Sequence, residues 1–103
     1  MVIEIARFHV APEQHKAFFN TFADVKTYVE QAEGYQSHII SREIEDPSRI
    51  SLLVKWRSYA DHVELFEPSK AHQMFINALM PFITGEVEVF HFNAALTSTG
   101  GEK

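Results

Sequence analysis

Trp56 and His62 are the side chains whose types and spacing are best suited to chemistry. They lie within residues 50–75, where a buried-strand pattern ends at the single tryptophan and a helix-like pattern carrying His62 begins. An imidazole titrates near neutral pH and can accept or donate a proton, whereas an indole can stack on a flat ligand or donate its N–H. An indole and an imidazole at this strand-to-helix corner could line one pocket for an aromatic compound.

Other aromatic and histidine side chains could complete this pocket. Phenylalanines on the helix faces that are expected to turn toward a sheet could form its apolar wall: Phe18, Phe22, Phe66 and Phe75. His72 on the last predicted helix and His38 on the second predicted strand are further candidates for substrate contact. We interpret the remaining histidines as structural or surface residues: His9, His15 and His91.

Each of these candidates also has a purely structural interpretation. A tryptophan at the end of a buried strand is commonly a core residue, and phenylalanine stripes on helices are most simply core. A histidine in the first turn of a helix often faces solvent. The choice between the two interpretations depends on whether Trp56 and His62 open onto a cavity.

The elements that would position these residues follow from changes in hydrophobic period. Residues 2–10 are β-rich, and Pro12 can open a helix over residues 12–32, which Gly34 would close. Residues 35–43 read as a second strand, followed by a turn at residues 45–48. In residues 50–56 every second residue is apolar, which puts Trp56 on the same strand face as Leu52.

The second half of the chain continues the pattern. Ser58 and Asp61 form a variant of the helix capping box before a short helix with His62, which Pro68 and Ser69 interrupt. A helix over residues 70–82 and a strand over residues 86–92 follow. The order β-α-β-β-α-β predicts an α+β, ferredoxin-like domain over residues 1–93 with a four-stranded antiparallel sheet, and a flexible tail over residues 94–103.

One face of such a sheet has no helices over it. It would carry Leu53 and one of two alternating sets of the first strand, either Ile3 with Ile5 or Ala6 with Phe8. An exposed apolar sheet is a liability for a monomer. We therefore expect a homodimer formed through the sheet faces.

Composition excludes several classes of function. The formal net charge of −5, without a Lys or Arg run, argues against nucleic acid and anionic membranes as partners. No apolar run reaches membrane-spanning length and no signal sequence is evident, so a cytoplasmic protein is expected. The chain has no cysteine, and no histidine spacing is a metal-ligand motif, so we expect no metal and no cofactor. A metal site assembled from strand histidines stays a weaker alternative.

The corner and its flanks resemble the antibiotic biosynthesis monooxygenase superfamily of dimeric α/β barrels. The similar segments are the strand LLVKW, the pair RS, the short helix YADHVELF and the segment EPSKAHQMF, and the resemblance extends over residues 2–92. It implies a ferredoxin-like dimer. The superfamily includes cofactor-independent monooxygenases that oxidise anthrones or quinols with molecular oxygen, haem-degrading enzymes and many members with no assigned activity.

The resemblance assigns roles to particular positions. In the anthrone-oxidising members an Asn four residues before the strand Trp, the Trp itself and a Tyr six residues after it line the pocket. Those positions are Leu52, Trp56 and His62 here, so the Trp matches, His replaces Tyr and Leu replaces the amide. The positions used by haem-degrading members are Ala6, Leu65 and Phe75, and none of them carries the required residue.

The resemblance and the residues together favour a cofactor-free monooxygenase acting on a small aromatic compound, with His62 and Trp56 as catalytic residues. Two alternatives stay open. One is a non-catalytic dimeric module that binds a small hydrophobic molecule. The other is an acid/base isomerase or cyclase that uses the same pocket.

Overall fold

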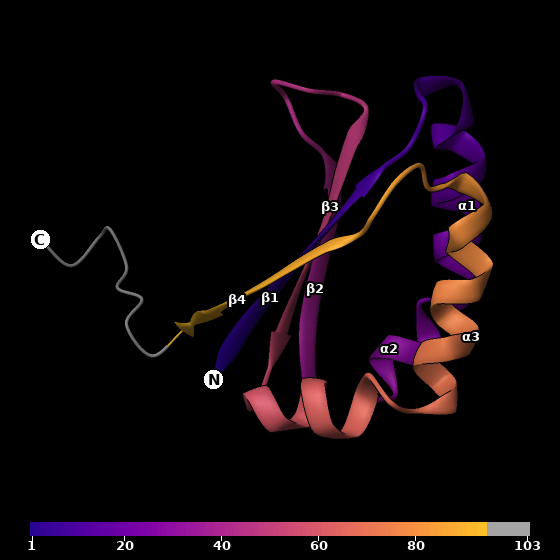
Figure 1. Ribbon diagram of the computed structural model, residues 1–103. Helices are drawn as coiled ribbons and strands as arrows, with labels where there is room; N and C mark the ends of the chain where they lie inside the picture. The colour runs from indigo at the N-terminus through magenta and orange to yellow at the C-terminus, as the bar shows by residue number, and fades with distance from the viewer. Residues whose placement is uncertain (95–103) are drawn as a thin grey trace, which may run out of the picture.

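A four-stranded antiparallel sheet carries all helices on one of its faces (Figure 1). The strands lie in the order β2-β3-β1-β4, which makes the two most apolar strands central. Their bounds are β1 (Val2–His9), β2 (Tyr35–Arg42), β3 (Arg49–Trp56) and β4 (Glu88–Asn93). The structure, a computed structural model, describes residues 1–94, so the tail expected from residue 94 lies outside the described residues from residue 95 on.

The helical segments fill the connections between β1 and β2 and between β3 and β4. They are η1 (Pro12–Gln14), α1 (His15–Val25), α2 (Thr27–Glu30), η2 (Asp61–Phe66), α3 (Lys70–Leu79) and η3 (Met80–Phe82). This order confirms the predicted α+β, ferredoxin-like arrangement. No helix formed by residues 1–94 has the length and apolar character needed to cross a membrane.

Both long helices differ in detail from the sequence expectation. The helix predicted over residues 12–32 is divided at Lys26, where the chain tightens and the Val29 N–H bonds to the Lys26 carbonyl oxygen. The helix predicted over residues 70–82 is α-helical only to Leu79. Pro81 has no N–H to continue the helical hydrogen bonds beyond Met80, so the chain continues as the short 3₁₀ turn η3.

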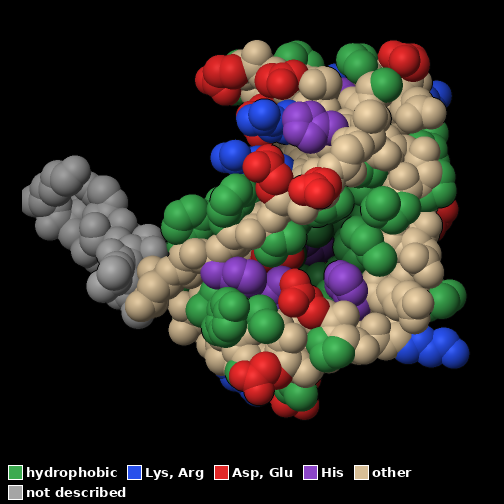
Figure 2. Space-filling model, in the orientation of Figure 1, with side chains coloured by type: hydrophobic (Ala, Val, Ile, Leu, Met, Phe, Trp, Pro, Cys, Tyr) green, Lys and Arg blue, Asp and Glu red, His purple; other side chains and the backbone are tan. Residues whose placement is uncertain are grey.

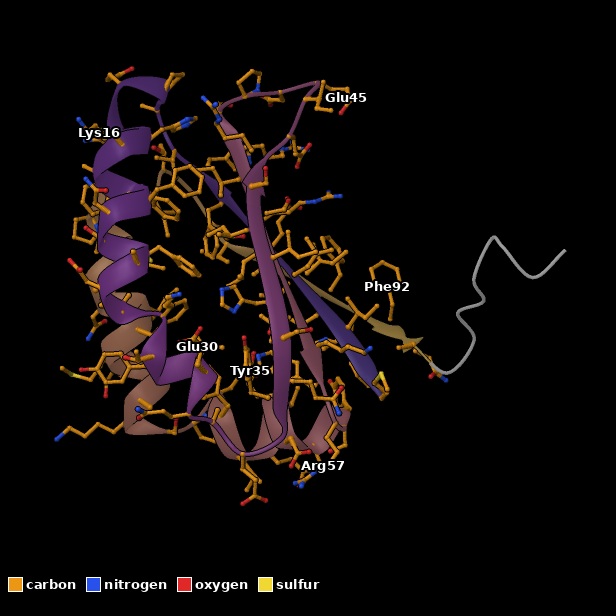
Figure 3. The ribbon with its side chains drawn as sticks, turned by 180° about the vertical axis from the view of Figure 1, so that it is seen from behind. Lys16, Glu30, Tyr35, Glu45, Arg57 and Phe92 are labelled. Carbon is orange, nitrogen blue, oxygen red and sulfur yellow. The ribbon has the colours of Figure 1, made fainter. Side chains whose placement is uncertain are left out.

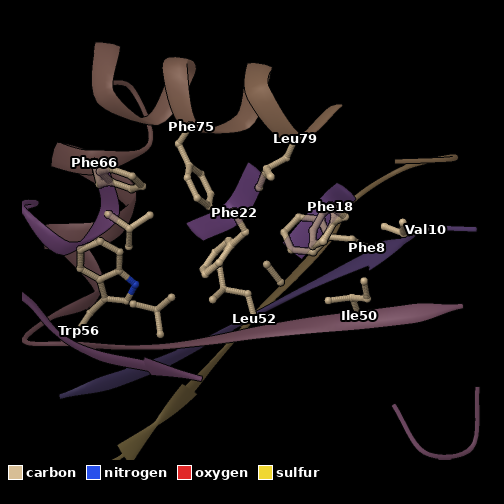
Figure 4. Close-up of a cluster of buried hydrophobic side chains, with 13 residues drawn as sticks. Phe8, Val10, Phe18, Phe22, Ile50, Leu52, Trp56, Phe66, Phe75 and Leu79 are labelled. Carbon is tan, nitrogen blue, oxygen red and sulfur yellow. The ribbon is translucent and has the colours of Figure 1, made fainter. Parts of the chain in front are cut away.

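The core lies between the sheet and the helices, where aromatic side chains meet (Figure 4). From the sheet, every second residue of β3 is buried as predicted: Ile50, Leu52, Val54 and Trp56. From the helices, the largest buried side chains are Phe18, Phe22, Phe66, Phe75 and Leu79. On β1 the set that faces the helices is Ala6 with Phe8, which decides the choice that the sequence left open.

The other sheet face carries an apolar row that no helix of residues 1–94 covers. Four side chains pair in register across all strands, in the order Ile39, Leu53, Ile5 and Phe90. Phe92 extends this row and projects away from the helices (Figure 3), with 55% of its surface exposed. We call this surface the open face.

Candidate functional site

The indole of Trp56 and the imidazole of His62 stack on each other at the strand-to-helix corner. Their ring centroids are 5.0 Å apart at an interplanar angle of 23°. Trp56 is 0% and His62 is 2% exposed, so both rings are removed from bulk water. Because Trp56 is the last residue of β3 and His62 is the second residue of η2, the strand-to-helix corner itself creates this contact.

A network of ionic and polar contacts fixes the corner. The Arg57 guanidinium donates to both carboxylate oxygens of Asp61, at 2.8 Å each, and Ser58 Oγ accepts the Asp61 N–H. The Arg57 N–H also bonds to the carbonyl oxygen of Gly34, at 2.7 Å. Arg57 and Ser58 lower the pKa of Asp61, which stays ionised and holds the adjacent His62 in place.

The segment that carries His62 is a π-helix rather than the α-helix expected. The Glu67 N–H bonds to the His62 carbonyl oxygen five residues back, at 2.8 Å. Single π-turns are rare and occur preferentially at functional sites. The wider turn places Asp61, His62 and Phe66 together on the buried side of the segment.

A carboxylate, Glu4 of β1, lies beside the stacked rings and is only 7% exposed. The Trp56 indole N–H donates to Glu4 Oε1 at 2.9 Å. His62 Nε2 lies 3.3 Å from the same oxygen. A buried carboxylate needs such partners because its desolvation is costly.

His91 of β4 completes the polar cluster. It is the direct cross-strand partner of Glu4, so both side chains project to the helix-covered face. His91 Nε2 lies 2.8 Å from His62 Nδ1, within hydrogen-bond distance. The half-buried His91 ring also meets the exposed Tyr59 ring edge-on, with centroids 4.8 Å apart, and so reaches the surface.

Burial shifts the proton affinities of this cluster in opposite directions. It raises the pKa of Glu4 to about 7, with the Trp56 hydrogen bond opposing the shift and the Glu67 charge adding to it. Burial also lowers the pKa of His62 to about 4, and His91 and His72 add to this effect. Both shifts favour uncharged groups, so between about pH 4 and about pH 7 the contact joins a carboxylic acid and a neutral imidazole rather than two ions.

His72 of α3 stands at the edge of this cluster. Burial lowers its pKa, while the nearby Glu67 acts in the opposite direction. Its ring packs edge-on against Phe66, with the centroids 5.2 Å apart. His72 therefore adds a second neutral imidazole near the site.

A cavity of about 50 Å³ opens beside these residues, between the sheet and the helices. Its polar lining consists of Glu4, Trp56, His62, Glu67 and His72. Its apolar lining includes Leu52, Phe66, Phe75, Val87 and Val89. Figure 2 shows a hollow on this side, between β4 and α3, with histidine and acidic side chains gathered at its rim. The volume suffices for dioxygen or one or two waters and is well below that of a typical ligand site.

The structure brings six of the nine residues predicted for the site to this cavity: Trp56, His62, Leu52, Phe66, Phe75 and His72. In the part of the chain described, the other three lie outside its lining. Phe18 packs against Phe8 and Phe82, toward the far end of the core. Phe22 packs against Phe75 and His38, and the Tyr35 hydroxyl lies 2.6 Å from His38 Nδ1.

Sequence reasoning missed Glu4, Glu67 and His91. Glu4 occupies one position in the otherwise apolar alternation that continues with Ala6, Phe8 and Val10, which was the available signal. His91 was interpreted as structural or surface, because its neighbour depends on strand register. Within residues 1–94 no group of three His, Asp or Glu side chains is arranged to hold a metal ion.

Comparisons with known proteins agree with this fold. The profile of a family described as antibiotic biosynthesis monooxygenase matches residues 1–78. The Bacillus subtilis protein YczJ is 30% identical over 92 residues, which cover 89% of this chain and 97% of that protein.

Solved structures of other proteins have the same fold. One from Bordetella bronchiseptica, described as a member of the same family, superposes with a TM-score of 0.84 at 25% identity, over 89% of this chain and 94% of that one. A mutant of SnoaB, a cofactor-independent oxygenase from Streptomyces nogalater, has a TM-score of 0.76 at 20% identity, over 93% of this chain and 94% of that one. The SnoaB match bears on the fold alone, since fold does not imply function.

Proposed function

Because the chain belongs to the antibiotic biosynthesis monooxygenase family, we propose that it is a cofactor-independent monooxygenase that oxidises a small quinol- or anthrone-like compound with molecular oxygen. One observation carries this proposal. The stacked Trp56 and His62 line an enclosed, largely apolar cavity together with a buried carboxylate. A binding module has no need of a buried carboxylate whose pKa is near neutrality.

The reaction needs a base, donors and a dry cavity. Loss of a proton from an anthrone-like substrate leaves a carbanion, which transfers one electron to dioxygen. The carbon radical that remains combines with the superoxide formed, and the resulting peroxide anion takes up a proton. The hydroperoxide formed loses water and leaves a carbonyl group. The protein accepts the first proton and stabilises the oxyanion that develops.

The residues at the cavity fit these tasks. The His62 ring can exchange a proton with Glu4, which also lines the cavity, because its burial keeps it neutral. The Trp56 indole presents a flat apolar surface, while its N–H is committed to Glu4. Phe66 and Phe75 exclude water, which prolongs the life of a carbanion.

The aromatic substrate enters only when the walls of the cavity separate, because about 50 Å³ is too little for a ring system. Phe66 lines this cavity and also an outer groove of about 390 Å³ between α2 and the start of α3. Rotation of the Phe66 ring would join the two spaces. The groove would then admit the substrate while the inner cavity retains room for dioxygen.

Oxygen consumption with a panel of hydroquinones and anthrones tests the proposal. We expect uptake by the wild-type protein and a loss of about 100-fold or more in His62→Ala, the usual contribution of an acid/base group. His9→Ala is the matched control, because His9 lies at the other end of β1 from the residues that pair with Trp56. An unchanged rate in His62→Ala would remove His62 from the mechanism. Binding of these compounds without oxygen uptake would instead favour the non-catalytic module.

An acid/base isomerase or cyclase is a second candidate. The contact between Glu4 and His62 favours it, because two groups that can exchange a proton suffice for this chemistry without dioxygen. Exchange of substrate hydrogen for solvent deuterium under anaerobic conditions distinguishes the two. Exchange that leads to a rearranged product without oxygen uptake would establish the isomerase.

The open face supports a homodimer in which two sheets meet. Its row of Ile39, Leu53, Ile5 and Phe90 is apolar across all four strands, and a hollow of about 230 Å³ between Ile3, Ile39 and Leu53 offers space for side chains of a second copy. Leu53→Arg would place a charge at the centre of this row, so sedimentation should show a monomer. Asn77→Arg on the exposed side of α3 is the control that should keep the dimer. A dimeric Leu53→Arg protein would contradict the interface.

A further inference from the structure

Three titratable side chains form a continuous path from the cavity to the surface. Glu4 Oε1 lies 3.3 Å from His62 Nε2, and His62 Nδ1 lies 2.8 Å from His91 Nε2. The path begins at a carboxylate that is 7% exposed and ends at a half-buried ring beside the exposed Tyr59. His62 offers one ring nitrogen to each of its two neighbours, which is the geometry that a proton relay requires.

From this geometry we infer that Glu4 is the base that takes the proton from the substrate, and that His62 and His91 carry this proton to solvent. The inference rests on the proposed function and changes the part that His62 plays in it. His62 passes protons between two partners and does not hold one. Glu4 is then the catalytic base and His91 is the exit of the relay.

The transfer balances without any further reactant. The proton captured on Glu4 Oε2 comes to face His62 when the carboxyl group makes a half-turn, which exchanges its two oxygens and restores the Trp56 hydrogen bond. In this loaded state Glu4 is a carboxylic acid that donates to His62 Nε2, the His62 Nδ1–H donates to His91 Nε2, and His91 Nδ1 carries a proton. Each proton then moves one step along the path, and the one on His91 Nδ1 leaves to water. The emptied state has a Glu4 carboxylate, a proton on His62 Nε2 and a proton on His91 Nε2. Neither imidazole carries a net charge in either state.

The chemical setting assigns the base to Glu4. A buried His62 with its pKa near 4 is a weak base at neutral pH, whereas Glu4 with its pKa near 7 both accepts and releases a proton there. Trp56 fixes Oε1 by its hydrogen bond. Within residues 1–94 Oε2 makes no hydrogen bond, and Glu4 lines the cavity, so this oxygen is left for a substrate.

Titratable or hydrogen-bonding groups on every neighbouring element lie near this carboxylate. They are Trp56 of β3, His91 of β4, His62 of η2, Glu67 at the end of η2 and His72 of α3. Glu67 is the only one of these that is an anion, and it lies 3.8 Å from His62 Nε2. Its charge favours a protonated Glu4, so it assists proton capture.

NMR of the full chain with ¹⁵N-labelled histidine and ¹³C-labelled glutamate tests the relay directly. As the Glu4 carboxyl carbon titrates, the proton on His62 should move from Nδ1 to Nε2 with the same midpoint, without the ring becoming charged. The His91 ring nitrogens should change with that midpoint as well. A relay couples these three signals, whereas a merely structural contact leaves His62 in one tautomer.

Two variants test whether the titration of Glu4 causes the pH midpoint that Glu4 and His62 share. Glu4→Gln should abolish the tautomer change in His62. Trp56→Phe removes the donor that stabilises the carboxylate, so the midpoints of Glu4 and His62 should rise together. His9→Gln should change nothing. The inference is overturned if His62 keeps one tautomer across neutral pH, or if its change persists in Glu4→Gln.

Kinetics with a hydroquinone or anthrone that the wild-type protein oxidises completes the test. Glu4→Gln should lower kcat by about 100-fold or more, and His91→Ala should lower kcat at unchanged KM, with recovery when imidazole is added to the buffer. An unchanged kcat in Glu4→Gln would refute its role as base. Absence of oxygen uptake by the wild-type protein would count against the proposed function, whereas the shared midpoint decides the relay independently.

Discussion

Each face of the sheet carries residues that a simple monomer would place on the other face. On β1 the residues alternate, so that Glu4 projects under the helices and is 7% exposed, while Ile3 and Ile5 project to the open face. At the edge of the open face, Phe92 is 55% exposed. The buried side thus holds a carboxylate, and the uncovered side holds the apolar row.

The difference indicates two separate demands on one strand. Burial of a polar group without a hydrogen bond costs about 2–7 kcal/mol, and burial of an ion costs more. The Trp56 hydrogen bond offsets part of this cost for Glu4, so the presence of this carboxyl group under the helices points to chemistry rather than to stability. An apolar open face costs solubility and points to a second protein surface. The proposed reaction thus belongs to the core face, and the proposed assembly belongs to the open face.

The largest expected effect on the free energy of unfolding comes from a Phe-to-Ala substitution, compared between the two faces. Phe75→Ala removes a ring that is 4% exposed, and we expect a loss of about 3–5 kcal/mol in the free energy of unfolding. Phe92→Ala removes a ring that is 55% exposed, and in the monomeric Leu53→Arg background the loss should be below about 1 kcal/mol. Urea denaturation measures both. Equal losses would mean that the open face is already covered within one chain.

The next effect concerns the pH dependence of stability. The pKa of Glu4 is raised from 4.5 to about 7, so between these values the folded protein keeps a proton that the unfolded chain releases, and stability falls as pH rises. The pKa of His62 is lowered from 6.5 to about 4, so the folded protein lacks a proton that the unfolded chain keeps, and stability rises with pH. Between about pH 4.5 and about pH 6.5 the two slopes oppose each other and nearly cancel.

Single substitutions should expose each slope. In Glu4→Gln only the His62 contribution remains, so the free energy of unfolding should rise with pH, by at most about 1.4 kcal/mol per pH unit. The measured slope should be smaller than this limit because solvent near the cavity screens part of the charge. His62→Gln should show a fall of similar size. Glu88→Gln on the exposed part of β4 is the control for loss of a surface carboxylate. Parallel pH profiles in the wild type and both variants would contradict the opposing contributions of Glu4 and His62.

Two glycines with positive φ test how tightly the helix-covered side is packed. A Cβ at Gly34 (φ 86°) would overlap the Asp61 carboxylate, whereas a Cβ at Gly85 (φ 75°) would meet nothing within 4 Å. Both Ala substitutions carry the strain of a left-handed residue, about 1–2 kcal/mol. Gly34→Ala should lower the free energy of unfolding by about 1–3 kcal/mol more than Gly85→Ala does, because the added Cβ overpacks against Asp61. It should also weaken the hydrogen bonds between Arg57 and Asp61 beside His62. Thermal unfolding of the pair gives this difference, and equal costs would show that Asp61 moves freely.

The fold could be predicted because the hydrophobic period changes clearly between strands and helices. The contact between Trp56 and His62 was also accessible, since a strand end and the next helix start must be close in space. The capping pair of Ser58 and Asp61 was visible in the sequence, although the resulting segment is a π-helix. A π-turn depends on one added residue that packing accommodates, and local propensity does not encode it.

The rest of the site depends on strand register and on the choice of buried face. Glu4 meets His62 only because Ala6 and Phe8, rather than Ile3 and Ile5, face the helices. His91 adjoins Glu4 only because β1 and β4 pair in one register. A shift by one residue would turn the side chain of His91 to the open face, and the sequence alone does not fix that register.

The smallest effect concerns Arg7, a half-buried residue of the open face. Its guanidinium carbon lies 5.4 Å from the centre of the Phe90 ring, and Nε lies 3.8 Å from Glu43 Oε2. Such partly exposed contacts are worth about 1 kcal/mol or less. In the monomeric Leu53→Arg background, Arg7→Ala should therefore change the free energy of unfolding by less than about 1 kcal/mol in urea denaturation.

In the wild-type background the same substitution has a different meaning. If two sheets meet face to face, Arg7 loses its water on assembly, and its stacking on Phe90 is strengthened because the surrounding dielectric falls. Arg7→Ala should then weaken the dimer by more than it weakens the monomer, as measured by sedimentation over a range of protein concentrations. Arg7→Lys retains the charge but not the planar stacking, so its dimer should be of intermediate stability. An effect confined to the monomer would place Arg7 outside the interface and restrict assembly to the apolar row.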